Sequence, residues 1–205
     1  VCPAPCEEAC VLNINDAPVA IKLVEESIIN YAFEQGWVVA QPPERRTSKK
    51  VAIIGSGPAG LACAAQLNGA GHCVEIFERE DRAGGLLTYG IPNFKLEKHV
   101  VNRRLRLLEE EGVIFHLNAN VGFNVGVDCL RREFDAICLA GGATRARDLN
   151  VPGREMCGIY RAMEYLPQQN RSDFGDEVAE KISAAGKHVI VLGGGDTGAD
   201  CLGTA

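Results

Sequence analysis

The chain has 205 residues, of which 46% are hydrophobic and 23% charged, a composition typical of a globular protein rather than a disordered or fibrous one. Its 21 Lys and Arg residues against 27 Asp and Glu residues give a net charge of −6, which offers no basic surface to nucleic-acid phosphates. No apolar run reaches the roughly 18–20 residues that span a bilayer, so we expect neither a nucleic-acid partner nor a membrane segment.

The ends of the chain carry no start or stop signal. Val1 follows neither an initiator Met nor a secretory signal, and Ala205 comes soon after a glycine-rich turn without a helix cap. We therefore expect a fragment that is truncated at both ends. Most of the nine cysteines are scattered among apolar residues, which suits a reducing compartment. We expect the cytoplasm or, in a eukaryote, the stroma of a plastid or another organelle.

Three of the cysteines, Cys2, Cys6 and Cys10, are crowded into the first ten residues. Thiolates this close in sequence suit the ligation of an iron–sulfur cluster. Zinc sites usually combine Cys pairs that are two residues apart with a second pair, and no such pairs occur here. Because three cysteines do not complete a four-ligand site, a zinc site and no metal at all remain alternatives.

An amphipathic helix follows this cysteine segment. Residues 18–36 place apolar side chains at helical spacing along one face, with Gly36 as the expected end of the helix. Residues 41–48 then combine two prolines with charged and hydroxyl side chains, a pattern typical of a linker. Residues 1–47 are therefore expected to be a helical segment plus a domain linker.

The next segment alternates strand, glycine-rich turn, helix and strand. The apolar run 51–54 precedes the first glycine turn, residues 55–60, a helix is expected to about Asn68, and 74–77 is a second strand. Glu78 closes this second strand. The pattern predicts a βαβ unit.

The glycines of the first glycine turn match a dinucleotide-binding fingerprint. Gly55 permits the tight turn, Gly57 lets a pyrophosphate approach the backbone, and Gly60 lets the helix lie close to the strand. The N–H groups at the helix start favour an anion, and Glu78 can accept hydrogen bonds from a ribose. The alternative is a turn that needs glycine for conformation only.

The pattern of strand followed by glycine turn occurs a second time near the end of the chain. A second glycine turn, residues 193–198, follows an apolar run that predicts another strand. The acid or arginine that chooses between NADH and NADPH should lie about 20 residues past such a turn, beyond Ala205. The other expected elements are a helix over 97–111, a strand over 113–117, a buried strand over 134–139, a helix over 159–166, a polar loop over 170–176 and the strand over 187–192.

Two dinucleotide fingerprints in one chain suggest two facing dinucleotides. A nicotinamide that lies against a flavin transfers a hydride by apposition, so we expect no catalytic side chain. The four histidines show no metal spacing and are expected to be ordinary helix or strand-edge residues. The expected fold is α/β, with tandem Rossmann-like domains preceded by the helical segment.

Four runs together resemble the small (beta) subunit of glutamate synthase and the C-terminal NAD(P)H-oxidising portion of fused glutamate synthases. They are VCPAPCEEACVLNIN, KKVAIIGSGPAGLACAAQLNGAGHCVEIFEREDRAGGLLTYGIPNFKLEKHVV, DAICLAGGATRARDLNVPGRE and HVIVLGGGDTGADC. The resemblance covers nearly the whole chain in the family's order. It implies a disulfide-reductase-like fold, with the end of a 4Fe-4S segment plus linker over 1–47, an FAD-binding domain over 48–155, and a connection and the start of an NAD(P)-binding domain over 156–205.

The resemblance also implies the site residues. FAD would contact the first glycine turn, Glu78, the following glycine pair and a later loop, and NADPH or NADH would contact the second glycine turn. The implied FAD residues are Gly55, Ser56, Gly57, Pro58, Ala59, Gly60, Glu78, Gly84, Gly85, Leu86, Lys95, Gly141, Gly142, Ala143 and Thr144; those for the pyridine nucleotide are Gly193, Gly194, Gly195, Asp196 and Thr197; and those for the 4Fe-4S cluster are Cys2, Cys6 and Cys10, with Glu25 as a further candidate.

The implied activity is that of the electron-input module of glutamate synthase. Electrons would pass from NAD(P)H to FAD, then through 4Fe-4S clusters to the FMN of the large, amidotransferase-bearing subunit or domain, where 2-oxoglutarate and glutamine yield glutamate. The alternatives are another FAD and iron–sulfur reductase, of the dihydropyrimidine dehydrogenase type or a ferredoxin-NADP transhydrogenase subunit, a non-catalytic FAD-binding scaffold, and a zinc-bearing regulatory domain. We expect the isolated fragment to be inactive.

Overall fold

The computed structural model describes residues 1–205, and the chain divides into two compact units, Val1–Ala40 and Gln41–Ala205. The division falls at the start of the predicted linker over 41–48. No helix of either unit has the length and the apolar character that crossing a bilayer requires.

The first unit is helical. A short helix α1 (Pro5–Glu8) and a 3-10 turn (Val11–Ile14) precede α2 (Ile21–Glu34), which confirms the predicted amphipathic helix. Gly36 adopts a φ of +67°, the left-handed conformation that commonly ends a helix. No residue of α2 is buried, and Ile28 is 64% exposed, so the predicted apolar face is present but uncovered.

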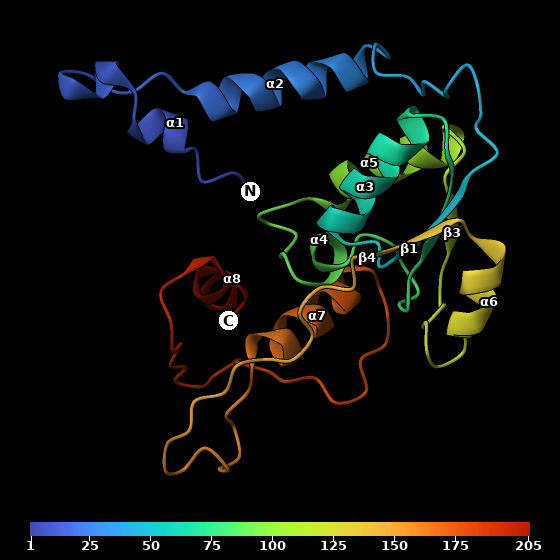
Figure 1. The fold of residues 1–205 in the computed structure, drawn as a ribbon. Helices are drawn as coiled ribbons and strands as arrows, with labels where there is room; N and C mark the ends of the chain where they lie inside the picture. The colour runs from blue at the N-terminus through green and yellow to red at the C-terminus, as the bar shows by residue number, and fades with distance from the viewer. The chain divides into compact units, whose positions relative to one another are not determined.

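The second unit is built on a parallel four-stranded sheet in the order β3-β2-β1-β4 (Figure 1). Helix α3 (Pro58–Gly69) joins β1 to β2, which confirms the predicted βαβ unit. The later helices are α4 (Leu86–Tyr89), α5 (Lys98–Glu110), α6 (Val127–Glu133), α7 (Ala162–Asp173) and α8 (Asp196–Thr204). The strands are β1 (Lys50–Ile54), β2 (Cys73–Phe77), β3 (Ile114–His116) and β4 (Ala136–Leu139).

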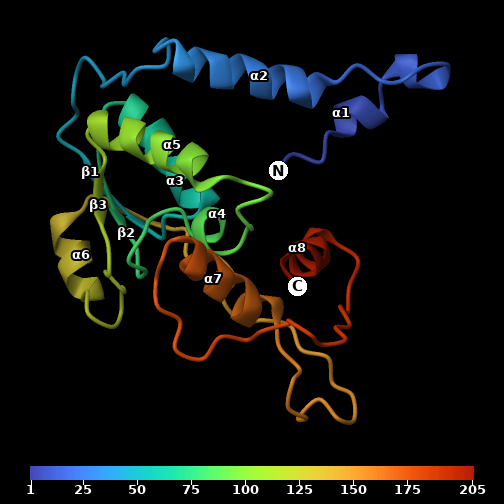
Figure 2. The same ribbon diagram turned by 180° about the vertical axis from the view of Figure 1, so that it is seen from behind.

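Helices cover both faces of this sheet, with α3 and α5 on one side and α6 on the other (Figures 1 and 2). Ile53 of β1 packs toward α3 and α5 and is fully buried, whereas Ala52 packs toward Leu130 of α6. Alternate side chains of a strand point to opposite faces, so a strand that is covered on both faces must be apolar throughout. The run over 51–54 meets this requirement.

The predicted linker is tied to the second unit. The Arg46 guanidinium donates hydrogen bonds to the carbonyl oxygens of His72 at 2.9 Å and Glu111 at 2.5 Å, which follow α3 and α5. The Thr47 N–H donates to the carbonyl oxygen of Gly71 at 2.7 Å. The linker segment therefore binds, through these hydrogen bonds, to the chain at the C-terminal ends of α3 and α5.

Two strand predictions require correction. Of residues 134–139 only Ala136–Leu139 form a strand, β4, and it is not buried, because it lies at the edge of the sheet and Leu139 is 80% exposed. Residues 187–192 form no strand, and Ile190 is 85% exposed. A strand needs a neighbouring strand for its N–H and C=O groups, and none lies beside this run.

The helix predicted over 159–166 is displaced toward the C-terminus. Helix α7 begins at Ala162, where the Glu164 carboxylate accepts a hydrogen bond from the Arg161 N–H at 3.0 Å, and it continues to Asp173. Most of the predicted polar loop over 170–176 is therefore helical. Asn170 is buried in α7 and donates to the carbonyl oxygen of Tyr89 at 3.0 Å, which explains why a polar residue continues this helix.

Candidate dinucleotide-binding site

The first glycine turn leaves β1 and enters α3 in a geometry that only glycine allows. Gly55 adopts a φ of +103°, and a Cβ there would lie 2.5 Å from the carbonyl oxygen of Ala140. A Cβ on Gly60 would lie 2.0 Å from the carbonyl oxygen of Gly55, so the helix and the turn are in direct contact. A Cβ on Gly57 would meet nothing within 4 Å. The turn is thus closed on the strand side and open at Gly57.

The open side has the character of an anion site. Gly57 precedes the first residue of α3, and no side chain caps the N–H groups of this helix start. Uncapped N–H groups and the positive end of the helix dipole favour a bound phosphate. The residues present at this turn therefore fit the pyrophosphate of a dinucleotide.

Glu78 and Ser56 join the end of β2 to the first glycine turn. Glu78 is only 5% exposed, and its Oε2 accepts hydrogen bonds from the Ser56 N–H at 2.9 Å and from the Ser56 hydroxyl. The Ser56 Oγ in turn accepts from the Gly84 N–H at 2.9 Å. Ser56, which the resemblance assigns to the phosphates, thus directs both its hydroxyl and its amide to Glu78.

The glycine pair after β2 lies directly on the first glycine turn. Gly84 and Gly85 have φ values of +114° and +53°, and a Cβ on Gly85 would lie 2.8 Å from the Cα of Gly57. Leu86, the first residue of α4, is exposed. Gly85 therefore lies beside the open side of the turn.

The loop after β4 begins beside the first glycine turn. The Cα of Gly141 would lie 3.1 Å from a Cβ on Gly55, and Gly142 and Thr144 are exposed farther along the loop. The structure thus brings the start of this loop to the turn and leaves its later residues in solvent.

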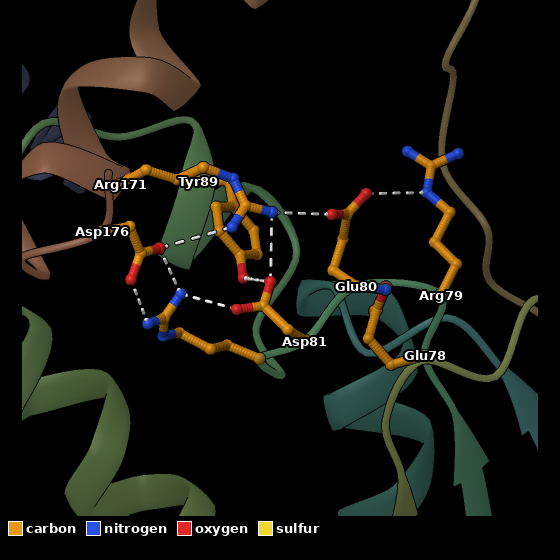
Figure 3. Close-up of polar contacts among 8 residues, drawn as sticks. Glu78, Arg79, Glu80, Asp81, Tyr89, Arg171 and Asp176 are labelled. Atoms are coloured by element: carbon orange, nitrogen blue, oxygen red, sulfur yellow. Dashed lines mark hydrogen bonds and ion pairs between the residues drawn. The ribbon is translucent and has the colours of Figure 1, made fainter. Parts of the chain in front are cut away.

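A cluster of charged side chains, which the sequence analysis missed, surrounds Tyr89 (Figure 3). The Asp176 carboxylate receives two hydrogen bonds from Arg82, each at 2.7 Å. Arg171 of α7 bridges Glu80 and Asp81, each at 3.1 Å. We name this set the Asp81 cluster; its members are Glu80, Asp81, Arg82, Tyr89, Arg171 and Asp176.

The Asp81 cluster shifts the pKa values of its members. The hydroxyl of Tyr89 donates to Asp81 at 2.6 Å and lowers the pKa of that carboxyl, and Arg82 lowers the pKa of Asp176. Burial and the Asp81 contact raise the pKa of Tyr89 to about 12. These pairs join the segment after β2 to α4 and α7, so the cluster stabilises the position of α4, whose N-cap residue Gly85 lies against Gly57. The run of charged residues directly after Glu78 was the one sequence feature that pointed to this cluster.

The second glycine turn repeats the local geometry of the first. Gly193 adopts a φ of +124°, and a Cβ on Gly198 would lie 2.7 Å from the carbonyl oxygen of Gly193. A Cβ on Gly194 or Gly195 would meet nothing within 4 Å. Helix α8 starts at Asp196, whose side chain is 90% exposed, and Thr197 is also exposed.

Lys95 lies at the second glycine turn rather than at the first. Its Nζ contacts the carboxylates of Asp200 at 2.8 Å and Asp196 at 3.3 Å. The resemblance assigned Lys95 to the flavin site, whereas in the structure its ammonium group pairs with two carboxylates of α8.

The predicted cluster ligands do not form a metal site in this structure. Cys2 and Cys6 are exposed, and no group of three or more His, Cys, Asp or Glu side chains is placed to hold a metal ion. A hydrogen bond from the backbone near Val19 lowers the pKa of Cys10, which favours its thiolate. Glu25 is exposed on α2. The arrangement therefore does not fit a cluster held by these four residues alone.

Known proteins resemble the chain over its whole length. The model of the pyridine nucleotide-disulphide oxidoreductase family matches residues 49–205. The chain is 56% identical over its whole length to the glutamate synthase (NADPH) small chain of Mycobacterium tuberculosis (strain CDC 1551 / Oshkosh), of which it covers 43%. It is also 56% identical to the glutamate synthase (NADH) of Schizosaccharomyces pombe, of which it covers 10%. These relatives confirm the predicted resemblance.

A solved structure agrees with the α/β fold. FprA from Mycobacterium tuberculosis in complex with NADPH aligns with a TM-score of 0.55 and 28% identity over 60% of this chain and 29% of that protein. The chain thus spans less than half the length of both the M. tuberculosis small chain and FprA.

Proposed function

This chain belongs to the pyridine nucleotide-disulphide oxidoreductase family, and from this membership we propose that it is part of the electron-input module of a glutamate synthase. The observation that carries the proposal is the first glycine turn with its open side at Gly57 and the buried Glu78 beside it. The family match and the names of the relatives support the same assignment.

We propose that the first glycine turn holds FAD, which when bound takes up electron pairs from a nicotinamide and releases them onward. Gly57 leaves room for the pyrophosphate, and the start of α3 supplies N–H donors to it. Glu78 holds the turn through Ser56, and a carboxylate at this position is the group expected to accept hydrogen bonds from the ribose. Gly85 lies against Gly57 on the side of α4.

The second glycine turn is the proposed site for NADPH or NADH. Gly194 and Gly195 leave the start of α8 open, as Gly57 does at the start of α3. With a nucleotide in each turn, the chain's residues would bind and orient the two cofactors, and no side chain needs to carry a proton. The domain limits at 48–155 and 156–205 are part of this proposal.

The onward path and the partner are also proposed. Electrons would leave through a 4Fe-4S cluster to the FMN of the large glutamate synthase portion, in a reducing compartment such as the cytoplasm or an organelle stroma. The S. pombe relative, of which the chain covers only 10%, supports a link to a much longer polypeptide. Cys2, Cys6 and Cys10 remain predicted ligands, which would need further ligands or a rearrangement of this segment.

The test is an anaerobic titration of the full-length protein with NADPH and with NADH, followed by visible absorbance. The proposal predicts that at least one nucleotide bleaches the flavin absorbance, and that the assembled enzyme forms glutamate from 2-oxoglutarate and glutamine. A flavin that neither nucleotide reduces would contradict it. Flavin reduction without glutamate formation in the presence of the large subunit would favour another reductase of this group.

A further inference from the structure

We propose that Lys95 is a positioning residue that holds the second glycine turn against the flavin-binding half and screens its acidic side chains from the pyridine nucleotide. This inference rests on the proposed function. Lys95 lies in the loop over residues 90–97, between α4 and α5, about 100 residues before the helix that it contacts.

The contact between Lys95 and α8 is a double ion pair with one buried partner. The Asp200 side chain is 11% exposed and lies 2.8 Å from the Lys95 Nζ, whereas the Asp196 side chain is 90% exposed and lies 3.3 Å from it. The hydrogen bond to Asp200 raises the pKa of Lys95, so its ammonium group stays charged at neutral pH. A buried carboxylate that loses its cation is strongly destabilised.

Two further contacts hold α8 in the same place. The ring of Phe94, the neighbour of Lys95, covers Gly203, where a Cβ would come within 2.5 Å of the ring. On the α7 side, the Tyr165 hydroxyl donates to the carbonyl oxygen of Thr204 at 3.0 Å. Helix α8 is therefore held both by the loop over 90–97 and by α7.

The loop over 90–97 is itself fixed to the segment that covers the first glycine turn. Lys98 is 9% exposed, and its Nζ donates to the carbonyl oxygens of Leu87 at 3.1 Å and Leu96 at 3.4 Å, and also to that of Ile91. Leu87 belongs to α4, which begins directly after Gly85. A continuous set of contacts thus runs from the first turn to the second.

Electrostatics give Lys95 a second role. Asp196 and Asp200 place two negative charges on the first turns of α8, the end of the helix where a nucleotide phosphate would bind. Unscreened carboxylates there would repel the phosphate. Lys95 offsets this charge, so its loss should weaken the binding of the pyridine nucleotide more than it slows the transfer from a bound nucleotide.

The test uses the full-length holoenzyme with Lys95→Met, the conservative Lys95→Arg, and the control Lys49→Met, which removes an exposed lysine paired with Asp135 at 2.7 Å. For Lys95→Met we expect the KM for the nicotinamide nucleotide to rise about tenfold, kcat to change by less than about threefold, and FAD content to stay at the wild-type level. Lys95→Arg should recover most of the KM effect, and Lys49→Met should match the wild type.

Hydrogen exchange of the α8 amides provides a second measurement, which needs no turnover. Lys95→Met should speed this exchange, and Lys49→Met should not. A KM and an exchange rate that both match the wild type would overturn the inference, and so would loss of FAD from Lys95→Met, since that places Lys95 in the flavin site. If the wild type itself reduces no flavin, the proposed function fails, and the exchange of α8 then decides whether Lys95 holds this helix.

Discussion

The two glycine turns share a local geometry but differ in their surroundings. Each begins with a glycine at strongly positive φ, +103° at Gly55 and +124° at Gly193, and each ends with a glycine that packs on the carbonyl oxygen of the first. The first turn follows the interior strand β1 and is covered by Glu78 and the Gly84–Gly85 pair. The second follows an unpaired run and faces solvent.

This comparison separates what is encoded locally from what needs distant partners. The turn and the helix start depend on glycine positions within a few residues, so both motifs form them. The preceding strand depends on neighbouring strands, so only the first motif has one. We therefore expect equivalent substitutions at the two turns to differ in their cost in unfolding free energy, even though the two glycine motifs are alike.

The largest expected difference concerns the closing glycines. In Gly60→Ala the new Cβ would lie 2.0 Å from the carbonyl oxygen of Gly55, between a strand and a helix that are both packed, whereas in Gly198→Ala the distance is 2.7 Å and the run before the turn is exposed and unpaired. We expect Gly60→Ala to lose about 3 kcal/mol or more of unfolding free energy, and Gly198→Ala about 1 kcal/mol or less. Urea denaturation of this 205-residue chain measures both, and equal losses would contradict the comparison.

The strands offer the next test. Ile53 is fully buried in β1, whereas Ile190, in the corresponding run before the second turn, is 85% exposed. Ile53→Ala should cost about 2–5 kcal/mol, and Ile190→Ala less than about 0.5 kcal/mol in the same chain. A large effect of Ile190→Ala on the denaturation midpoint would mean that the second run is paired after all.

The carboxylates beside the two turns should differ by less. Glu78→Gln replaces a buried acceptor of the Ser56 N–H, and we expect it to cost about 2 kcal/mol and to lower FAD content. Asp196→Asn changes a side chain that is 90% exposed, and its cost should stay within about 0.5 kcal/mol. Thermal unfolding together with flavin absorbance of the full-length variants checks both, and retained FAD in Glu78→Gln would remove Glu78 from the site.

The smallest expected effect is the acid sensitivity of the Asp81 cluster. The folded-state pKa values of Asp81 and Asp176 lie below their ordinary value of 3.8, so the unfolded chain takes up protons first as the pH falls. The stability contributed by these carboxylates is thus fully present above about pH 4 and declines below it. The melting temperature of Asp81→Asn should fall less steeply from about pH 5 to about pH 3 than that of the wild type. Asp128→Asn, which changes an exposed carboxylate of α6, is the control, and an unchanged slope in Asp81→Asn would contradict the assignment.

The sequence predicted those features whose causes are local. The βαβ unit, the helix α5 and both glycine turns follow from periodicity and glycine spacing, and the structure contains all of them. The prediction of a strand over 187–192 was wrong because an apolar run forms a strand only beside a neighbouring strand, and the run itself does not supply one. The Asp81 cluster was missed because Arg171 and Asp176 lie about 90 residues from Asp81, and Arg171 was assigned to a loop.

The site was predicted less completely than the fold. Gly57 and Gly85 lie side by side at the first turn, because a Cβ at position 85 would lie 2.8 Å from the Cα of Gly57 and only glycine leaves that space free. The contact of Lys95 with α8 depends on the packing of two distant segments, which no local pattern reports. Which ligands the turns hold, and whether Cys2, Cys6 and Cys10 ligate a cluster, remain predictions.

The most direct test of the central claim, that the first glycine turn is a preformed FAD site, is the flavin content of the full-length Gly57→Ala variant. A Cβ on Gly57 meets nothing within 4 Å, and its φ of −64° suits any residue, so the substitution should leave the fold and its melting temperature unchanged. The account predicts that FAD binds about tenfold more weakly or is lost, because the methyl group fills the space of the pyrophosphate. Gly69→Ala, at the other end of α3 and equally free of contacts, should keep its flavin. Wild-type FAD content and affinity in Gly57→Ala would contradict the account.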